Sequence, residues 1–394
     1  MPTYMSKTPF IFHSIQDSQI FALSQAAGRA GFPILATSRP LAPWGKNSRY
    51  FQSCIDMPCL FEVGEGMYTA NLKSNDLKGV WLTCMDDVAD FTAKHQDALR
   101  RNGLQFISPN RDTLHIVSDG HGLHSSSTLQ FAPTYLATKD ELLNTIQELD
   151  YPIMLKSARN YFCVFDHAND LQQTLLSNAI PCYVEDKYRI QKYIDGEVES
   201  MATAMLLFDN EGRPIRGFTG RRTDVTPTYF GPFGETTQAK AEWIPELYEG
   251  AKDLLQSIGW KGFAEVECKQ GPDGQWYVME INPRLSGWAC LAETDGAGFL
   301  QAYHEMCTNN TRLEEACLQR SQSKYIRLSG TCEHMPAWLP AEGTFGKIRA
   351  LLTIFSHYRK HRPNISLGCW DDLDLRASWS VFWFTLKDVF WYSR

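Results

Sequence analysis

The chain has 394 residues, which is long enough for two or three domains that each bury a hydrophobic core. It contains 45 acidic and 38 basic residues, and the resulting net charge of −7 argues against nucleic acid as a partner, because non-specific nucleic-acid binding needs a basic surface. The 11 cysteines form no CxxC pairs, which favours reduced thiols over a disulfide framework or a zinc site.

The first hundred residues have the pattern of a small parallel α/β domain. Apolar segments predict strands, and a segment of helical periodicity between the first two ends at Gly31. The predicted strands are 9–15, 33–40, 79–87 and 104–109. No GxGxxG fingerprint is present, so dinucleotide binding is not expected. The N-terminus lacks signal-peptide architecture, and no apolar run reaches about 18 residues, so we expect a cytoplasmic protein.

The pattern changes at about Pro133, where helices and strands no longer alternate regularly. Helical periodicity or strand composition predicts the following elements. The expected helices are 139–149, 167–178 and 246–259, and the expected strands are 151–158, 182–194, 198–209, 262–269 and 275–283. The last two strands flank the sequence GPDG, which predicts a β-hairpin.

Polar residues follow a strand period at the end of this hairpin, in the sequence YVMEINPRLSG. Successive strand residues point to opposite faces, so Glu280, Asn282 and Arg284 are expected on one face, with Met279 and Ile281 on the other. The partner strand also places Glu265 and Glu267 on one of its faces. The pattern fits either a metal site or the solvated face of an exposed hairpin.

A metal site requires the two polar faces to coincide, so that the carboxylates converge. Carboxylates about 4 Å apart repel by roughly 4 kcal/mol at an effective dielectric near 20, and a divalent cation removes that cost. Oxygen ligands of this kind suit Mg²⁺ or Mn²⁺. Arg284 would then face phosphate oxygens.

Three further segments have two interpretations each. Lys156 ends an apolar strand and either contacts phosphate or extends to the surface. The segment RIQKYIDGEVES is either a plain hairpin or a strand that offers its backbone to a purine and Glu199 to a ribose. The Gly-, Thr- and Arg-rich segment 217–238, with Arg221 and Arg222, is either an anion-binding loop or a surface loop.

The C-terminal residues 346–394 combine a basic amphipathic segment with an aromatic-rich one. A helix of this composition can lie at a membrane interface, so peripheral membrane contact is one interpretation. The other is that the aromatic side chains cover the core of the main domain, which we favour.

The order of these pieces resembles the ATP-grasp superfamily, and most of all its carboxylate–amine ligases and carbamoyl-phosphate-synthase-like members. The resemblance rests on a strand Lys, then QKYIDGEVE, an Arg-rich segment, GFAEVE and EINPR, and it covers roughly residues 9 to 310. It implies a pre-ATP-grasp α/β domain over 1–105, a two-lobed ATP-grasp domain over 106–320 with a lid at about 130–195, and a C-terminal aromatic-rich extension over 321–394.

The resemblance also implies a role for each matching residue. Phosphates of ATP would contact Lys156, and the adenine would lie at the hinge formed by Gln191, Lys192, Tyr193 and Ile194, with Glu199 on the ribose. Magnesium would bind Glu267, Glu280 and Asn282. Arg284 would steady the transferred phosphoryl group, and Arg221 and Arg222 would face phosphates or substrate.

The implied reaction joins a small-molecule carboxylate to an amine. The carboxylate attacks the γ-phosphate of ATP to give an acyl phosphate and ADP, and the amine then displaces phosphate. One departure from the family is the missing Asp-Lys pair before the lid, where Asp119-Gly120 stands instead. This departure keeps two alternatives open, a nucleotide-binding regulatory or scaffold protein and another ATP-grasp reaction such as phosphotransfer or carboxylation. The sequence identifies neither the substrates nor the oligomeric state.

Overall fold

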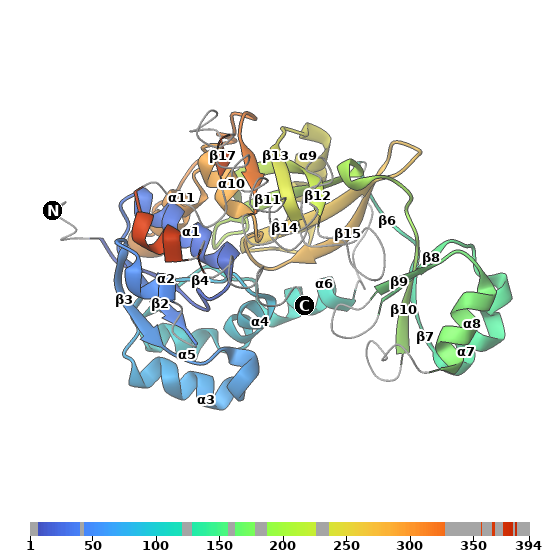
Figure 1. Ribbon diagram of the computed structural model, residues 1–394, viewed down its shortest axis with the longest axis horizontal. Coiled ribbons are helices and arrows are strands. Elements are labelled where there is room, and N and C mark those ends of the chain that lie inside the picture. The colour runs from blue at the N-terminus through green and yellow to red at the C-terminus, as the bar shows by residue number, and fades with distance from the viewer. Residues whose placement is uncertain are drawn as a thin grey trace.

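The computed structural model describes the six segments 7–39, 43–119, 128–156, 162–177, 187–225 and 236–327, together with four short C-terminal pieces, 356, 365–366, 373–380 and 383. Within these residues the strands form three sheets. Figure 1 shows the largest of them, the central sheet, with an N-terminal sheet on one side and a smaller sheet, here called the lid sheet, on the other.

The N-terminal sheet is parallel and has the strand order β3-β2-β1-β4-β5, which confirms the predicted parallel α/β architecture. Its strands are β1 (Phe10–Phe12), β2 (Ile34–Ser38), β3 (Phe51–Asp56), β4 (Gly79–Leu82) and β5 (Leu104–Gln105). The helices around it are α1 (Ser18–Arg29), α2 (Pro43–Asn47), α3 (Leu60–Ser74), α4 (Asp86–Lys94) and α5 (Gln96–Arg101), and α6 (Arg111–Asp119) follows.

Alternation along β1 explains why this sheet is covered on both faces. Phe10 and Phe12 belong to one hydrophobic core and Ile11 to another, on the opposite side of the sheet. The strands β2 and β4 lie on either side of β1. The chain order therefore reverses between β1 and β4, and ligands of such sheets bind beyond the carboxyl ends of the strands at that point.

The central sheet has the order β17-β16-β13-β12-β11-β14-β15-β6. Its strands are β6 (Leu129–Phe131), β11 (Met201–Phe208), β12 (Pro214–Val225), β13 (Thr236–Ala241), β14 (Gly262–Gln270), β15 (Trp276–Asn282), β16 (Lys324–Ile326) and β17 (Ile365–Ser366). The strands β14 and β15 pair antiparallel, which confirms the predicted hairpin.

The two faces of the central sheet pack against different helices. Ala204 and Val266 pack with α9 (Pro245–Ser257), whereas Met205 and Phe263 pack with α10 (Ala289–Thr294) and α11 (Phe299–Asn309). The second face shares its hydrophobic core with strands β1, β2 and β4 of the N-terminal sheet. This face is therefore turned toward the N-terminal sheet.

The segment 217–238 is not simply a loop, and that interpretation was wrong at both of its ends. Residues 217–225 belong to β12, which pairs with β11 and β13, and residues 236–238 belong to β13. Position 220 of this strand requires glycine, because a Cβ atom there would lie only 2.7 Å from the ring of Trp288. Residues 226–235 lie outside the described part of the chain.

The lid sheet is antiparallel, with the order β7-β10-β8-β9. It consists of β7 (Thr134–Thr138), β8 (Ile153–Lys156), β9 (Phe162–Phe165) and β10 (Lys187–Lys192), with α7 (Lys139–Thr145), the short 3₁₀ helix η1 (Ile146–Glu148) and α8 (Ala168–Leu176). These elements share one hydrophobic core of their own. Between β10 and β11, the 3₁₀ helix η3 (Val198–Ser200) occupies the start of a predicted strand.

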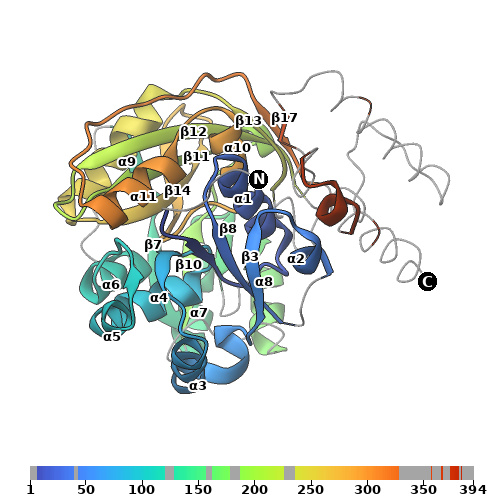
Figure 2. The ribbon, with the colours of Figure 1, turned by 90° about the vertical axis from the view of Figure 1, so that its left-hand side faces the viewer.

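Most of the predicted C-terminal extension lies outside the described residues. Of its described pieces, residues 373–380 lie beside α1 and α2 (Figure 2). There the buried carboxylate of Asp374 accepts hydrogen bonds from Ser48 Oγ at 2.6 Å and from the amide of Arg49 at 2.8 Å. Ala377 packs against Phe21 and Trp44. Across the described chain, no helix is long and apolar enough to cross a membrane.

Candidate functional site

The hairpin of β14 and β15 brings the predicted acidic residues together. Glu267 lies directly opposite Glu280, and Glu265 lies directly opposite Asn282. Residues opposite one another in an antiparallel pair share a face, so all four side chains lie on the side of the central sheet that faces the N-terminal sheet. We call these four residues the acidic cluster.

Hydrogen bonds join the acidic cluster to two arginines. The Asn282 amide donates to Glu265 Oε2 at 3.1 Å and to Glu267 Oε1 at 3.4 Å. Arg284 Nη1 donates to Glu265 Oε2 at 2.7 Å, and Arg222 pairs with Glu267. The structure therefore brings Arg222, Glu267, Asn282 and Arg284 into one network, in which Glu265 is a member that the predicted ligand set did not include.

A β-bulge at Met279 changes the predicted alternation along β15. Glu267 pairs with Glu280, whereas the next residue of β14, Cys268, pairs with Val278, so Met279 has no partner of its own. Val278 and Ile281 consequently face the same core, which strict alternation excludes. The expectation that Met279 shares a face with Ile281 was therefore wrong.

The bulge leaves the carbonyl group of Met279 free to bind a residue of the lid sheet. Lys156, the last residue of β8, donates from Nζ to this oxygen at 3.3 Å. The lysine also interacts electrostatically with Glu280 and Glu267. The predicted phosphate-binding lysine thus lies beside the acidic cluster, at the junction of the lid sheet and the central sheet.

Burial and mutual repulsion perturb the charges of the acidic cluster. Burial, and then the charge of Glu267, raise the pKa of Glu265 and raise that of Glu280 to about 7. Burial lowers the pKa of Lys156, against the attraction of Glu280. Solvent still reaches Glu280, but protein atoms around it remove part of its hydration. Among the described residues, no hydrogen bond or ion pair engages this carboxylate.

The raised pKa of Glu280 gives a pH prediction for the ligand-free protein. Because the folded state holds this proton up to about pH 7 and the unfolded chain releases it near pH 4.5, the contribution of Glu280 to stability falls as the pH rises through this window. We expect Glu280→Gln to make the melting temperature less dependent on pH between 5 and 7.5. Thermal unfolding at several pH values without Mg²⁺ tests this, and equal slopes for both proteins would contradict it.

Asp86 is a member of the site that the sequence analysis missed. It is the first residue of α4, and its Oδ1 lies 3.0 Å from Arg284 Nε. Burial disfavours the charge of Arg284, but the carboxylates of Glu265, Asp86 and Glu267 together raise its pKa above the usual value. The position of Asp86 just beyond β4, at the point where the strand order reverses, is the signal that could have identified it.

Arg221 and Glu199 lie apart from the acidic cluster. Arg221 is adjacent to Arg222 in β12 and therefore points to the opposite face, where its Nη2 pairs with Glu242 at 2.8 Å. Hydrogen bonds from Arg221 are the main reason that the pKa of Glu242 falls to about 2. Glu199 lies exposed in η3, and its carbonyl group accepts from Arg221 Nη1 at 2.7 Å.

The predicted adenine hinge spans the end of β10, the last strand of the lid sheet: Gln191 and Lys192 belong to the strand, and Tyr193 and Ile194 follow it. Lys192 Nζ pairs with Asp150 at 2.7 Å, and Ile194 is buried. The ring of Tyr193 lies 4.8 Å below the ammonium of Lys269. Gln191 is also buried, and while its Nε2 donates to Thr134 at 3.0 Å, its Oε1 has no hydrogen-bond partner in the described structure. A buried acceptor without a partner is costly, so a ligand that reached this oxygen would relieve that cost.

The donor set of the acidic cluster fits a magnesium ion shared with phosphates. No group of three or more His, Cys, Asp or Glu side chains in the described segments is already arranged to hold a metal. Mg²⁺ is commonly bound by one or two carboxylates, with waters and substrate phosphates in the remaining positions. Glu267 and Glu280, opposite each other with Asn282 nearby, would supply such a set, and a bound cation would offset the burial and the repulsion from Glu267 that raise the pKa of Glu280.

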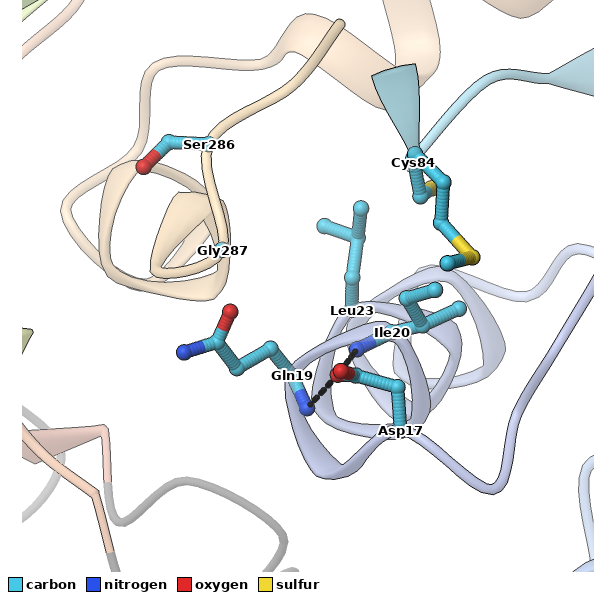
Figure 3. Close-up of a pocket in the computed structure, with 8 residues that line it drawn as sticks. Asp17, Gln19, Ile20, Leu23, Cys84, Ser286 and Gly287 are labelled. Carbon is cyan, nitrogen blue, oxygen red and sulfur yellow. Dashed lines mark hydrogen bonds between the residues drawn. The ribbon is translucent and has the colours of Figure 1, made fainter. Parts of the chain in front are cut away.

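A cavity of about 40 Å³ lies between α1, the end of β4 and the turn after Arg284. Figure 3 shows Gln19 directed toward Gly287, with Asp17 accepting hydrogen bonds from the first turn of α1. A space of this size holds water molecules and is too small for a substrate. One of its lining residues, Ser286, donates a hydrogen bond to Glu265, so the cavity lies next to the acidic cluster.

The fold resembles those of several solved enzymes, although neither a protein-family model nor a curated protein matches the sequence. An L-amino acid ligase from Bacillus licheniformis has a TM-score of 0.56 and 18% identity over 77% of this chain and 75% of its own. A biotin carboxylase complex from Campylobacter jejuni has a TM-score of 0.58 and 13% identity, and the match covers 82% of this chain and 75% of its own. An N5-carboxyaminoimidazole synthetase from Staphylococcus aureus with ADP has a TM-score of 0.54 and 15% identity, and the match covers 78% of each chain.

These neighbours share one architecture, and identities of this size establish the fold alone. They have the ATP-grasp fold, which is the fold that the order of the motifs predicted. This chain has a parallel N-terminal sheet, an antiparallel lid sheet and a large central sheet, and the match to these structures covers 77–82% of it. The chain therefore has the ATP-grasp fold.

Proposed function

We propose that this protein is an ATP-dependent ligase that joins a carboxylate to an amine through an acyl phosphate and releases ADP and phosphate. The observation that carries the proposal is the meeting of the acidic cluster with Arg222, Arg284 and Lys156, because it places carboxylates and cations from two sheets in one site. The names of the solved neighbours, which include ligases and a carboxylase, agree with ATP-dependent chemistry on carboxylates.

Phosphoryl transfer needs positioned charges more than a protein nucleophile. Glu267, Glu280 and Asn282 would hold Mg²⁺, which neutralises phosphate oxygens when bound. Lys156 would contact the phosphates from the lid side, and Arg284 would stabilise the charge that develops on the transferred group. Closure of the lid sheet over the nucleotide would exclude water, which otherwise hydrolyses an acyl phosphate.

The proposal is tested by release of ADP from ATP and Mg²⁺ in the presence of paired carboxylates and amines. We expect one ADP and one phosphate per amide formed, and a requirement for both substrates. Calorimetry with Mg²⁺ and ADP is the companion measurement, since it needs no knowledge of the substrates. A protein that binds ADP without magnesium dependence, or that releases ADP with the carboxylate alone at the full rate, would contradict the proposed reaction.

Gln191 supplies a prediction about the base of the nucleotide. Its unpaired Oε1 would accept a hydrogen bond from the 6-amino group of adenine, whereas guanine offers an acceptor in that position. We expect Gln191→Leu to weaken ADP binding by about tenfold and to reduce the preference for ADP over GDP, because such a bond contributes about 1.4 kcal/mol. Competition calorimetry with both nucleotides measures the two effects.

The control for Gln191→Leu is Thr134→Val, which removes the partner of Nε2 but leaves Oε1 in place. We expect this variant to keep the preference for ADP over GDP. If both variants weaken the binding of ADP and of GDP by the same factor, Gln191 has only a structural role in the hinge.

A further inference from the structure

Arg284 is held by two carboxylates of very different accessibility. The side chain of Glu265 is 2% exposed, and its carboxylate also accepts hydrogen bonds from Asn282 and Ser286. The side chain of Asp86 is 59% exposed. Separating Arg284 from Glu265 would leave a buried charge without a partner, whereas Asp86 can regain water when it is released. Asp86 is therefore the exchangeable partner.

The two carboxylates also use different edges of the guanidinium group. Glu265 accepts from Nη1 at 2.7 Å. The two oxygens of Asp86 lie 3.0 Å from Nε and 3.4 Å from Nη2. The edge formed by Nε and Nη2 can bind a carboxylate or phosphate through two parallel hydrogen bonds. Asp86 thus takes up the edge that an anionic substrate would use.

We propose that Asp86 is an internal competitor for the anion-binding edge of Arg284, which an incoming carboxylate or phosphoryl group displaces. This inference rests on the proposed function, because it assigns Arg284 to substrate binding. Displacement costs little, since Asp86 is exposed and its charge remains favourable at the N-terminus of α4. While no anion is bound, Asp86 neutralises Arg284 and links the N-terminal sheet to the acidic cluster. Asp86 thereby sets how strongly an anion must bind to enter the site.

Inorganic phosphate is the probe for this inference, because it needs neither nucleotide nor a known substrate. We expect Asp86→Asn to strengthen phosphate binding by about two- to fivefold at low salt, the range typical of an exposed ion pair. The matched control is Asp90→Asn, which removes the same charge from an exposed position one turn later in α4. The control should leave the phosphate dissociation constant unchanged.

A double-variant cycle separates an effect through Arg284 from a general change of charge. Arg284→Lys keeps the positive charge but loses the two-donor edge, so adding Asp86→Asn to it should leave phosphate binding unchanged. Equal or weaker phosphate binding by Asp86→Asn, the same gain in Asp90→Asn, or a gain that persists in the Arg284→Lys background would each overturn the proposal. Failure of Mg²⁺-dependent ADP binding by the unmodified protein is a separate result, which counts against the proposed ligase.

The kinetic result distinguishes competition from positioning once a carboxylate substrate is identified. A competitor lowers the apparent affinity for the carboxylate, so Asp86→Asn should reduce KM by the same two- to fivefold while kcat is unchanged. A fall in kcat at constant KM would mean that Asp86 only orients Arg284, and it would overturn the competitor role.

Discussion

Replacing Glu280 with glutamine is expected to abolish carboxylate- and amine-dependent ADP release, with a loss on the order of 100-fold or more. The substitution removes one of the two carboxylates that would hold Mg²⁺ and leaves an amide of the same size. Among the described residues Glu280 has no ion-pair partner and lies in an exposed position, so the change should not unfold the protein. Release of ADP is measured by a coupled assay at saturating ATP.

The control for this substitution is Glu246→Gln in α9, because Glu246 is exposed on the opposite face of the central sheet. It should retain full activity. Calorimetry adds a second readout, since Glu280→Gln should weaken ADP binding with Mg²⁺ and leave the much weaker binding without Mg²⁺ unchanged. Normal turnover by the Glu280 variant would exclude a metal role for the acidic cluster.

This experiment also separates the ligase from its alternatives. A nucleotide-binding scaffold would take up ADP with Mg²⁺ through the acidic cluster but would show no substrate-dependent ADP release in the unmodified protein. A carboxylase or phosphotransferase would release ADP without an amine. The Asp-Lys pair whose absence raised the scaffold alternative would fall at 119–120, where Gly120 lies outside the described residues.

The part of the site that the sequence predicted depends on local structure. Glu280 and Asn282 share one face of β15, as a strand period of two predicts, and the short turn explains why β14 and β15 pair. They lie opposite Glu267 and Glu265 only because of the bulge at Met279, since a regular ladder would pair Glu267 with Met279. The same argument predicted that Lys156 ends a strand, although its contact with the carbonyl group of Met279 depends on how the lid sheet meets the central sheet.

The part that the sequence could not predict depends on register and tertiary contacts. Arg221 and Arg222 are adjacent, and only the pairing of β12 with β11 decides which of them faces the acidic cluster. The bulge at Met279 inserts one residue into an otherwise regular pattern, and periodicity gives no sign of it. Asp86 lies almost 200 residues from Arg284 in the chain, so their contact requires α4 to pack near the end of β15.

Replacing Arg284 with methionine is expected to destabilise the protein by about 3–5 kcal/mol near neutral pH, in addition to removing catalysis. Methionine fills similar space but leaves the charge of Glu265 buried, with Arg222 as the nearest remaining cation in the network. The pKa of Glu265 is already raised by burial, and loss of Arg284 should raise it further. Urea unfolding measures the change in apparent free energy.

The sign of the pH dependence identifies the cause of this destabilisation. With the folded-state pKa of Glu265 raised above its unfolded value, the folded variant binds a proton that the unfolded chain releases, so its stability falls as the pH rises between these two values. The free energy of unfolding of Arg284→Met should therefore be closer to that of the unmodified protein at pH 5 than at pH 8. Adding Glu265→Gln should recover most of the loss at pH 8, because it removes the buried charge. If the double variant is as unstable as the single one at pH 8, the loss of stability comes from the packing of the arginine side chain. The electrostatic explanation would then be wrong for Arg284.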